Sequence, residues 1–353
     1  MATYKTCFVD NDTVLFRAAK SCQEDFIIVE HKQTGWQQRF EGVSKFYGLG
    51  KDKNKGWIGE QNAKREGSGK PLISAQDFII TEHAELPKGK SKDQVIEEAL
   101  THIDFAVGRI KKTMDAEDYQ LGIAGNGKNW RFDHAHILPY KGNRKPKPIF
   151  FAEVKEAFVD KYKKHVFLVD NMEVDDKLGI IGWKNYQDFL RTGKWENILA
   201  YVDKDLKMII SPSFNYDKPE EGIRIPTPQE AAFCFCTQLL SGDKGTDNIQ
   251  GLPTLTREFQ EKYNLRKTRG IGVETVHKVL EGLSIKESFE RVVEAYRGFY
   301  GVDKKPFTSF RGETFEWNYL DYLKENALLL WMRRNEDEFY DIEDTLKRLK
   351  IEY

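Results

Sequence analysis

The sequence has few cysteines, no long apolar run and almost no net charge, and each of these facts narrows the class of protein. Its four cysteines, Cys7, Cys22, Cys234 and Cys236, include no C-x-x-C pair, so a zinc ribbon or a dithiol redox motif is not expected. No apolar stretch approaches the length of a membrane span, and the first residues lack the apolar run of a signal peptide. We expect a soluble protein of the cytoplasm, or of the host cytoplasm if the source is viral, with no membrane partner.

The formal net charge is −1 over 353 residues, so the total charge neither favours nor excludes nucleic acid as a partner. The distribution of charge is more informative than the sum. Between Lys128 and Lys164 there are ten Lys or Arg residues and only four Asp or Glu residues. This segment predicts a local basic patch on an otherwise near-neutral protein.

Short apolar runs alternate with helical patterns along much of the chain. Four such runs end in acidic or glycine-rich turns: 6–9, 119–124, 165–169 and 197–202. Unbroken apolar runs of this length are typical of buried strands in a parallel sheet. The clearest helical stripe covers 91–112 and begins with a capping box at Ser91 and Gln94. The alternation predicts an α/β fold with a central, mostly parallel sheet flanked by helices.

Residues 23–90 break this pattern. They are rich in glycine and lysine, and their short alternating runs predict hairpins around a loop. We interpret them as an insertion in a core that covers 1–240, and one interpretation of the insertion is an element that guides a strand. A second, basic segment at about 126–150 is expected to be arch-like, and 286–353 is expected to be a helical, charged extension.

Carboxylates follow the ends of the predicted strands or lie in later turns. The acidic residues concerned are Asp10, Glu173, Asp175, Asp176, Asp203, Asp205, Asp243 and Asp247. Open α/β sheets place their sites at the carboxyl ends of strands, and carboxylates gathered there raise one another's pKa until a cation relieves the repulsion. Oxygen ligands favour Mg²⁺ or Mn²⁺ over zinc, and two ions about 4 Å apart can hold an attacking water and a leaving oxygen in line.

A single acidic group of this kind is more often a helix cap or a solvated turn. Four groups, each placed after an apolar run or in a glycine-rich turn, favour a shared site instead. The sequence therefore predicts a hydrolase that cleaves phosphodiester bonds with two divalent metal ions.

Five motifs, in order, resemble those of the flap endonuclease/5′→3′ exonuclease superfamily, and most closely the stand-alone bacteriophage enzymes. They are F-V-D at 8–10, N-W-R at 129–131 with Y-K-G-N-R-K at 140–145, E-V-D-D at 173–176, D-K-D-L at 203–206, and G-D-K-G-T-D-N-I-Q-G-L-P at 242–253 followed by G-I-G at 270–272. The resemblance covers 1–20 and about 100–285, and it implies that 241–285 forms a helix–three-turn–helix that binds DNA.

The resemblance implies a division of the carboxylates between two metal ions. Asp10, Glu173 and Asp175 would hold the first ion, and Asp203, Asp205 and Asp247 the second, with Asp176 and Asp243 shared or one step removed. The family usually has an Asp where this chain has Asn126, which offers an oxygen without a charge and so predicts weaker binding of the first ion. Asp243 and Asp247 are also one residue further apart than the family pattern, and the stretch from Pro253 to Gly270 is longer.

The resemblance also assigns basic and aromatic residues. Lys141 and Arg144 would face the scissile phosphate, and Tyr140 would stack on a base at the point of cleavage. Contacts with DNA would come from Arg131, Lys145, Gly270, Gly272, Thr275 and Lys278. In relatives, the backbone around the two glycines holds duplex phosphates and can include a K⁺ ion.

The expected function is thus a 5′→3′ exonuclease or flap-type endonuclease, acting on DNA near 5′ ends, flaps, nicks and junctions, with RNA–DNA hybrids as a further substrate. We expect a monomer in DNA replication that works beside a separate polymerase or single-strand-binding protein. Two alternatives remain open: a PIN-type ribonuclease, and a non-catalytic binder of branched DNA with a degraded metal site. The G-x-x-x-x-G-K pattern at 122–128 lacks the Ser or Thr of a nucleotide-binding loop, since Asn129 follows it.

Overall fold

The computed structural model describes residues 3–48, 55–265 and 270–353. The chain divides into two compact units. The core unit contains residues 1–13, 107–146 and 162–353, and the insertion unit contains residues 14–106 and 147–161. Helices α1 (Asp12–Lys20) and α4 (Lys92–Thr113) carry the chain from one unit into the other.

A six-stranded sheet forms the centre of the core unit, in the order β6-β5-β1-β7-β8-β9. The strands are β1 (Tyr4–Asp10), β5 (Ala116–Ala124), β6 (Val166–Val169), β7 (Asn197–Tyr201), β8 (Ser213–Asn215) and β9 (Ile223–Arg224). The first five are parallel to one another, and only β9 is antiparallel to its neighbour. The predicted α/β fold with a mostly parallel sheet is confirmed.

The central strands are buried on both faces, which explains their unbroken apolar runs. In β7, Ile198, Leu199 and Ala200 are fully buried, and in β1 Val9 is 1% exposed. Helix α7 (Val174–Thr192) follows β6 and packs its Val174 and Leu178 into the same cluster as Leu199. The helix ends at Gly193, whose φ of 71° lies in the left-handed region that favours glycine.

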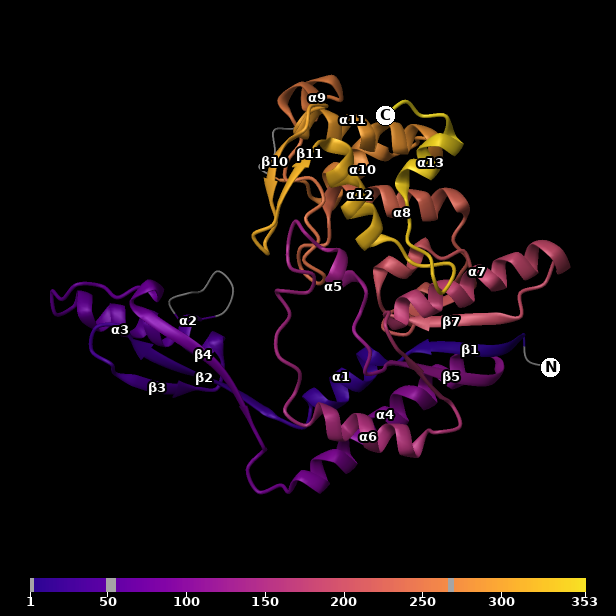
Figure 1. Cartoon of the computed structure of the whole chain (residues 1–353). Coiled ribbons are helices and arrows are strands. Elements are labelled where there is room, and N and C mark those ends of the chain that lie inside the picture. Colours follow the sequence, from indigo (N-terminus) through magenta and orange to yellow (C-terminus); the bar gives the residue numbers. More distant parts are fainter. Residues whose placement is uncertain (1–2, 49–54, 266–269) are drawn as a thin grey trace. The chain divides into compact units, whose positions relative to one another are not determined.

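Six helices that follow β9 lie close together (Figure 1), and their side chains form one large hydrophobic cluster. They are α8 (Pro228–Ser241), α9 (Arg257–Lys262), α10 (Val273–Leu280), α11 (Ile285–Tyr300), α12 (Tyr319–Leu330) and α13 (Ile342–Leu349). Phe235 of α8 packs against Trp331 at 5.0 Å, and Tyr296 of α11 donates to the carbonyl oxygen of Leu239 at 2.6 Å. The predicted extension 286–353 is therefore built into the core, and it also contains a hairpin, β10 (Lys305–Thr308) and β11 (Thr314–Trp317), that its charged pattern did not predict.

Shorter elements complete the core unit. Helix α5 (Arg131–His134) follows β5, and two 3-10 helices, η3 (Lys204–Met208) and η4 (Pro219–Glu221), lie between β7 and β9. In the described parts of the chain, no helix is both long and apolar enough to cross a membrane.

The insertion unit contains a three-stranded antiparallel sheet of order β3-β2-β4, as the alternating runs of 23–90 predicted. Its strands and associated helices are β2 (Glu24–His31), β3 (Gln37–Phe40), α2 (Val43–Tyr47), α3 (Trp57–Glu66), η2 (Ala75–Asp77) and β4 (Phe78–Glu85), with α6 (Phe151–Lys161) later in the chain. Ile27, Val29, Phe40, Phe46 and Phe78 form a separate buried cluster against which Trp57 packs. This small apolar core explains why a glycine-rich segment folds.

Candidate metal and phosphate site

Carboxylates from three loops meet at the carboxyl ends of β1, β6 and β7. Asp10 is the last residue of β1, Asp175 lies in the first turn of α7, and Asp203 follows β7. Because β1 pairs directly with β7, Asp10 and Asp203 leave the sheet side by side. The spacing of acidic residues after separate strands therefore corresponds to one location in the fold.

The electrostatics show that these carboxylates lie close enough to repel one another. Burial raises the pKa of Asp10 to about 7, with further increases from Asp12, Asp203 and Glu173. Burial also raises the pKa of Asp175 well above its usual value, and the charges of Asp10, Asp203 and Glu173 add to the effect. Without a cation, this group holds protons that isolated carboxylates would have lost.

A second group forms around Asp205 in η3. Burial raises the pKa of Asp205 to about 8, and the charges of Asp203, Asp243 and Asp247 raise it further, while Lys204 lowers it. Burial likewise raises the pKa of Asp247. The structure therefore divides the acidic residues into two overlapping groups with Asp203 in both.

The loop that carries Asp243 and Asp247 is closed by its own backbone. Asp243 and Ile249 exchange two backbone hydrogen bonds of 2.9 Å each, and the carbonyl oxygen of Asp247 accepts from the backbone N–H of Lys141 at 2.8 Å. This closure turns the side chain of Asp247 toward Tyr140 and Arg144. The wider spacing between the two aspartates is therefore accommodated within a closed loop.

The donor set suits a hard divalent cation. The Oδ1 atom of Asp175 is buried and has no hydrogen-bond partner within 3–48, 55–265 and 270–353. A buried, unpaired carboxylate oxygen among other carboxylates is the environment that Mg²⁺ or Mn²⁺ stabilises. Across those same ranges, no three His, Cys, Asp or Glu side chains converge closely enough to hold an ion as they stand.

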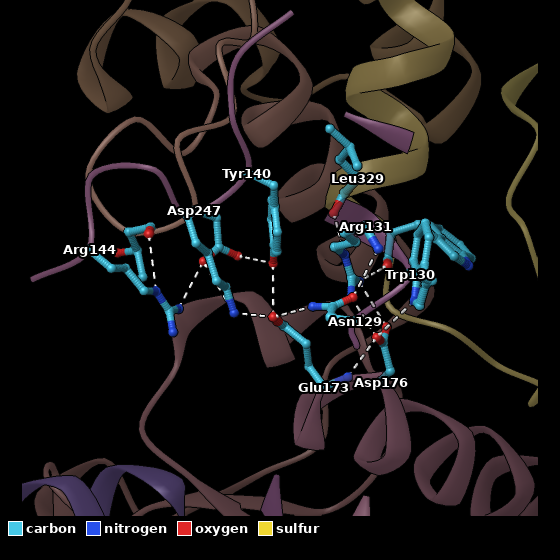
Figure 2. A network of polar contacts seen from close by, with 12 residues as sticks. Asn129, Trp130, Arg131, Tyr140, Arg144, Glu173, Asp176, Asp247 and Leu329 are labelled. Carbon is cyan, nitrogen blue, oxygen red and sulfur yellow. Dashed lines mark hydrogen bonds and ion pairs between the residues drawn. The ribbon is translucent and has the colours of Figure 1, made fainter. Parts of the chain in front are cut away.

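Glu173 is held by three donors that converge on its Oε1 atom (Figure 2). Asn129 Nδ2 donates at 2.6 Å and the hydroxyl of Tyr140 at 3.1 Å, and Lys141 forms an ion pair with the same oxygen. Burial alone would raise the pKa of Glu173, but the charges of Lys141 and Arg131 outweigh it and hold the pKa below its usual value.

Lys141 and Arg144, which the resemblance implied would face a phosphate, lie against the carboxylates. Lys141 Nζ is 3.7 Å from Asp247 Oδ1, and Arg144 Nη2 donates to the same oxygen at 3.0 Å. The side chain of Lys141 is 14% exposed and that of Arg144 is 49% exposed. Both cations are thus placed between the acidic groups and the surface, where a phosphate would approach.

Tyr140 differs from the expectation that it stacks on a base. The residue is 3% exposed, and its hydroxyl lies 2.9 Å from Asp247 Oδ2 and 3.1 Å from Glu173 Oε1, so its single proton is shared between the two carboxylates. A ring without an exposed face offers no surface for stacking. In this structure Tyr140 instead links the two acidic groups.

Arg131 and Asp176 form a fully buried ion pair, which corrects two further expectations. The guanidinium makes two parallel contacts to the carboxylate, Nη1 to Oδ2 at 2.5 Å and Nη2 to Oδ1 at 2.8 Å, and the two residues are 1% and 0% exposed. Arg131 therefore cannot contact DNA, and the Asp176 oxygens are already occupied and cannot serve a metal. Figure 2 shows this pair beside Glu173, the residue that precedes α7.

The ion pair is completed by a segment far along the chain. Arg131 Nε donates to the carbonyl oxygen of Leu329 and Nη2 to that of Trp331, both at 2.8 Å, and the backbone N–H of Arg333 donates to Asp176 Oδ1 at 3.3 Å. The segment 329–333 thereby fixes the first turn of α7, where Asp175 lies.

Glu325 of α12 holds the segment that precedes Tyr140. One of its oxygens accepts from the backbone N–H groups of His136 and Ile137 at 3.0 and 2.8 Å. The tip of the β10–β11 hairpin adds a bond from the N–H of Phe310 to the carbonyl oxygen of His136 at 3.1 Å. No local sequence pattern predicted these contacts, because Glu325 lies in an ordinary helical pattern.

Asn126 lies in an exposed turn that Asp170 organises. One Asp170 oxygen accepts from the backbone N–H groups of Asn126 and Gly127 at 2.8 and 3.1 Å. The side chain of Asn126 forms no hydrogen bond with the carboxylate groups in the described part of the chain. The sequence did not single out Asp170. Asp12, which lies just beyond Asp10 in the acidic set after the first strand, accepts from the N–H of Ala124 at 3.0 Å, and its charge raises the pKa of Asp10.

The residues expected to hold duplex DNA lie around the start of α10, apart from Lys145. Gly272 precedes the helix, Gly270 and Lys278 are exposed, Thr275 is half-buried, and Lys145 is also exposed. Part of the long stretch between Pro253 and Gly270 lies outside the described residues.

The fold and the site together define an α/β protein with two groups of buried carboxylates at the ends of parallel strands and a pair of basic residues against them. Among solved structures, the chain is similar to the T5 D15 protein, which was crystallised with metal ions; the two share 16% identity, the match covers 55% of this chain and 81% of that one, and the TM-score is 0.32. No family model and no curated protein matches the chain. Similarity this low assigns neither family nor activity, so the functional conclusion depends on the geometry of the site.

Proposed function

We propose that the protein is a divalent-metal-dependent nuclease that cleaves DNA near 5′ ends and at junctions between single strands and duplex. The observation that carries this proposal is the placement of Lys141 and Arg144 directly against two overlapping groups of buried carboxylates. Carboxylates alone would suit many metal sites, and cations alone would suit many anion sites. Their combination suits an anionic ester that is cleaved with the help of metal ions.

In this proposal, Asp10, Glu173 and Asp175 hold one Mg²⁺ or Mn²⁺ ion, and Asp203, Asp205 and Asp247 hold the other. Asp243, which is 6% exposed, supports the second group through its charge. The bound ions would supply an activated water and neutralise charge on the phosphate. Glu173 becomes available as a ligand when Lys141 exchanges it for a phosphate oxygen.

The basic residues would act on the phosphate directly. Lys141 and Arg144 now share Asp247 as an anionic partner, and a phosphate is an anion of the same kind. The Arg144 guanidinium can present two parallel donors to phosphate oxygens. Both residues would stabilise the negative charge that develops as the ester bond breaks.

We further propose that 241–285 binds duplex DNA through the region before α10. The exposed backbone at Gly270 and Gly272 and the first turns of α10, with Thr275 and Lys278, present N–H groups and a cation at one surface. A K⁺ ion between this backbone and a duplex phosphate would strengthen the same contact. Lys145 adds positive charge beside the carboxylate site.

The proposed activity is tested with purified protein and a duplex that carries a labelled 5′ single-stranded tail. We expect Mg²⁺- or Mn²⁺-dependent cleavage near the junction, with products that carry 5′ phosphates, and complete loss of cleavage in EDTA. The same tail made of RNA, and a blunt duplex, would serve as comparison substrates. Absence of cleavage, or cleavage that EDTA leaves unchanged, would contradict the proposal.

We also expect the metal-free protein to lose stability as pH rises. The folded-state pKa values of Asp10 and Asp205, about 7 and about 8, lie above their ordinary values near 4. The folded state therefore binds more protons than the unfolded state between these limits, so the stabilisation is full below about pH 4 and is lost as pH rises toward 8. In EDTA, a rise from pH 4 to pH 8 should therefore lower the contribution of these groups to the free energy of unfolding by about a few kcal/mol.

Chemical denaturation at pH 5, 6.5 and 8, with and without Mg²⁺, measures this effect. Mg²⁺ should restore stability more at pH 8 than at pH 5, since it replaces the bound protons. The Asp205→Asn variant keeps the side-chain volume but should show a smaller fall with pH than the wild type. An equal fall in both proteins would show that Asp205 does not titrate in this range.

A further inference from the structure

We propose that a cleft between the edge of the six-stranded sheet and helices α8 and α10 binds one nucleotide, with its base in the cleft and its phosphate toward Lys204 and Lys207. The cleft lies wholly within the core unit and has a volume of about 1150 Å³. This is ample for a nucleotide, since small-molecule sites commonly measure about 300–1000 Å³. The role of this binding site rests on the proposed nuclease function. The test of nucleotide binding does not depend on that function.

One end of the cleft reaches the carboxylate site. Asp203 and Lys204 line that end, and Gln238 on the wall donates through Nε2 to Asp205. Toward the other end, α10 contributes Val273 and His277. A molecule in the cleft would therefore extend from the reacting groups toward the helical part of the core unit.

The wall formed by α8 is mixed, and its apolar part is extended by residues from two other segments. Phe233 and Cys234 line it, with Ile225 from the segment after β9 and Leu280 from α10. Ile225 and Val273 are 44% and 56% exposed, so apolar surface that would normally be covered is open here. Phe233 and His277 pack edge to face, with ring centroids 5.1 Å apart and an interplanar angle of 75°, so a planar base could pack against one aromatic ring of this pair.

Two polar atoms that line the cleft are left without partners. Thr237 Oγ1 and Gln238 Oε1 are buried and form no hydrogen bond with any described residue, and Gln238 is only 4% exposed. A buried polar group without a partner costs about 1–3 kcal/mol. A hydroxyl, which can donate and accept, and an amide oxygen, which accepts, would suit the polar edge of a base, whereas an apolar peptide would leave both unpaired.

The charges in the cleft fix the direction of the nucleotide. Lys204 and Lys207 are exposed near Asp203, whereas Arg224, which also lines the cleft, is paired with Glu221 at 3.8 Å. The acidic residues Glu230 and Glu287 are engaged at helix starts, where they accept from the backbone N–H groups of Thr227 and Ser284. The available positive charge therefore lies at the carboxylate end, where hydrolysis would leave a 5′ phosphate.

The test measures nucleotide binding to the full-length protein in EDTA by isothermal titration calorimetry. Deoxynucleoside 5′-monophosphates are compared with inorganic phosphate and with a 5′-phosphorylated dinucleotide. We expect saturable binding of the mononucleotides and none of inorganic phosphate at equal concentration. Thr237→Val, which removes only the hydroxyl, should weaken binding about tenfold, the equivalent of 1.4 kcal/mol. Thr237→Ser should bind like the wild type.

Lys184→Ala, on the exposed part of α7 and outside the cleft, is the matched control and should leave the dissociation constant unchanged. Tighter binding of the dinucleotide would support the site and identify a strand end as its ligand. No mononucleotide binding at millimolar concentration, or binding that Thr237→Val leaves unchanged, would overturn the proposal. Binding is measured in EDTA, where metal-dependent cleavage does not occur. The protein can therefore bind nucleotides without being a nuclease, and it can be a nuclease without binding nucleotides in this cleft.

Discussion

The Asp175→Asn variant is expected to lose DNA cleavage about a thousandfold while its affinity for DNA stays close to that of the wild type. A thousandfold loss corresponds to roughly 4 kcal/mol of barrier, a size reasonable for the loss of a metal ligand. Asn has nearly the same volume as Asp, so the packing at the start of α7 is preserved. The substitution removes a negative charge from a buried group whose pKa is raised by burial and by Asp10, Asp203 and Glu173.

This result is measured by single-turnover cleavage of the tailed duplex and by equilibrium binding of the same duplex in Ca²⁺ or EDTA. Asp188→Asn, near the other end of the same helix and paired there with Arg191, is the matched control and should cleave like the wild type. Wild-type cleavage by Asp175→Asn would show that this carboxylate holds no catalytic metal. A parallel loss of binding and thermal stability would point to misfolding instead.

The second large effect is on stability. Arg131→Met should lower the free energy of unfolding by about 3–5 kcal/mol, because it leaves Asp176 buried without its partner. The carbonyl oxygens of Leu329 and Trp331 would also lose their donors. Urea denaturation at pH 7 measures the change, which a residue that only contacted DNA would not produce.

The Arg131→Met/Asp176→Leu double variant separates a buried ion pair from other causes. Removing both charges leaves neither one unpaired, so the double variant should be more stable than Arg131→Met alone. If the two substitutions instead destabilise additively, the pair makes no specific contribution to stability. Cleavage should remain impaired in the double variant, since 329–333 would no longer be tied to the first turn of α7.

The parts of the fold that the sequence predicted are those that depend on local sequence patterns. The apolar runs that end at Asp10 and Asp203 predicted two of the central parallel strands, and the acidic residues after them predicted where their side chains would meet. This inference succeeds because neighbouring parallel strands end at one edge of a sheet. The motif that contains Lys141 and Arg144 implied contact with a phosphate, and in the structure both residues lie beside the carboxylates.

The parts that the sequence did not predict depend on contacts between distant segments. The Arg131–Asp176 pair spans 45 residues, and the bond from Arg131 to Leu329 spans 198. No local periodicity distinguishes a buried Arg from an exposed one, so its burial could not be read from the motif. The burial of Tyr140 and the hydrogen bonds from His136 and Ile137 to Glu325 also depend on contacts between distant segments.

The bonds from Arg131 to the carbonyl oxygens of Leu329 and Trp331 have a consequence for the order of biosynthesis. During translation, every proposed metal ligand leaves the ribosome before the segment that fixes the first turn of α7 has been made. A nascent chain that ends before Leu329 thus carries all the carboxylates, yet its Arg131 lacks the acceptors that hold it in place. The first turn of α7 can therefore be fixed by these contacts only after Leu329 and Trp331 have been made.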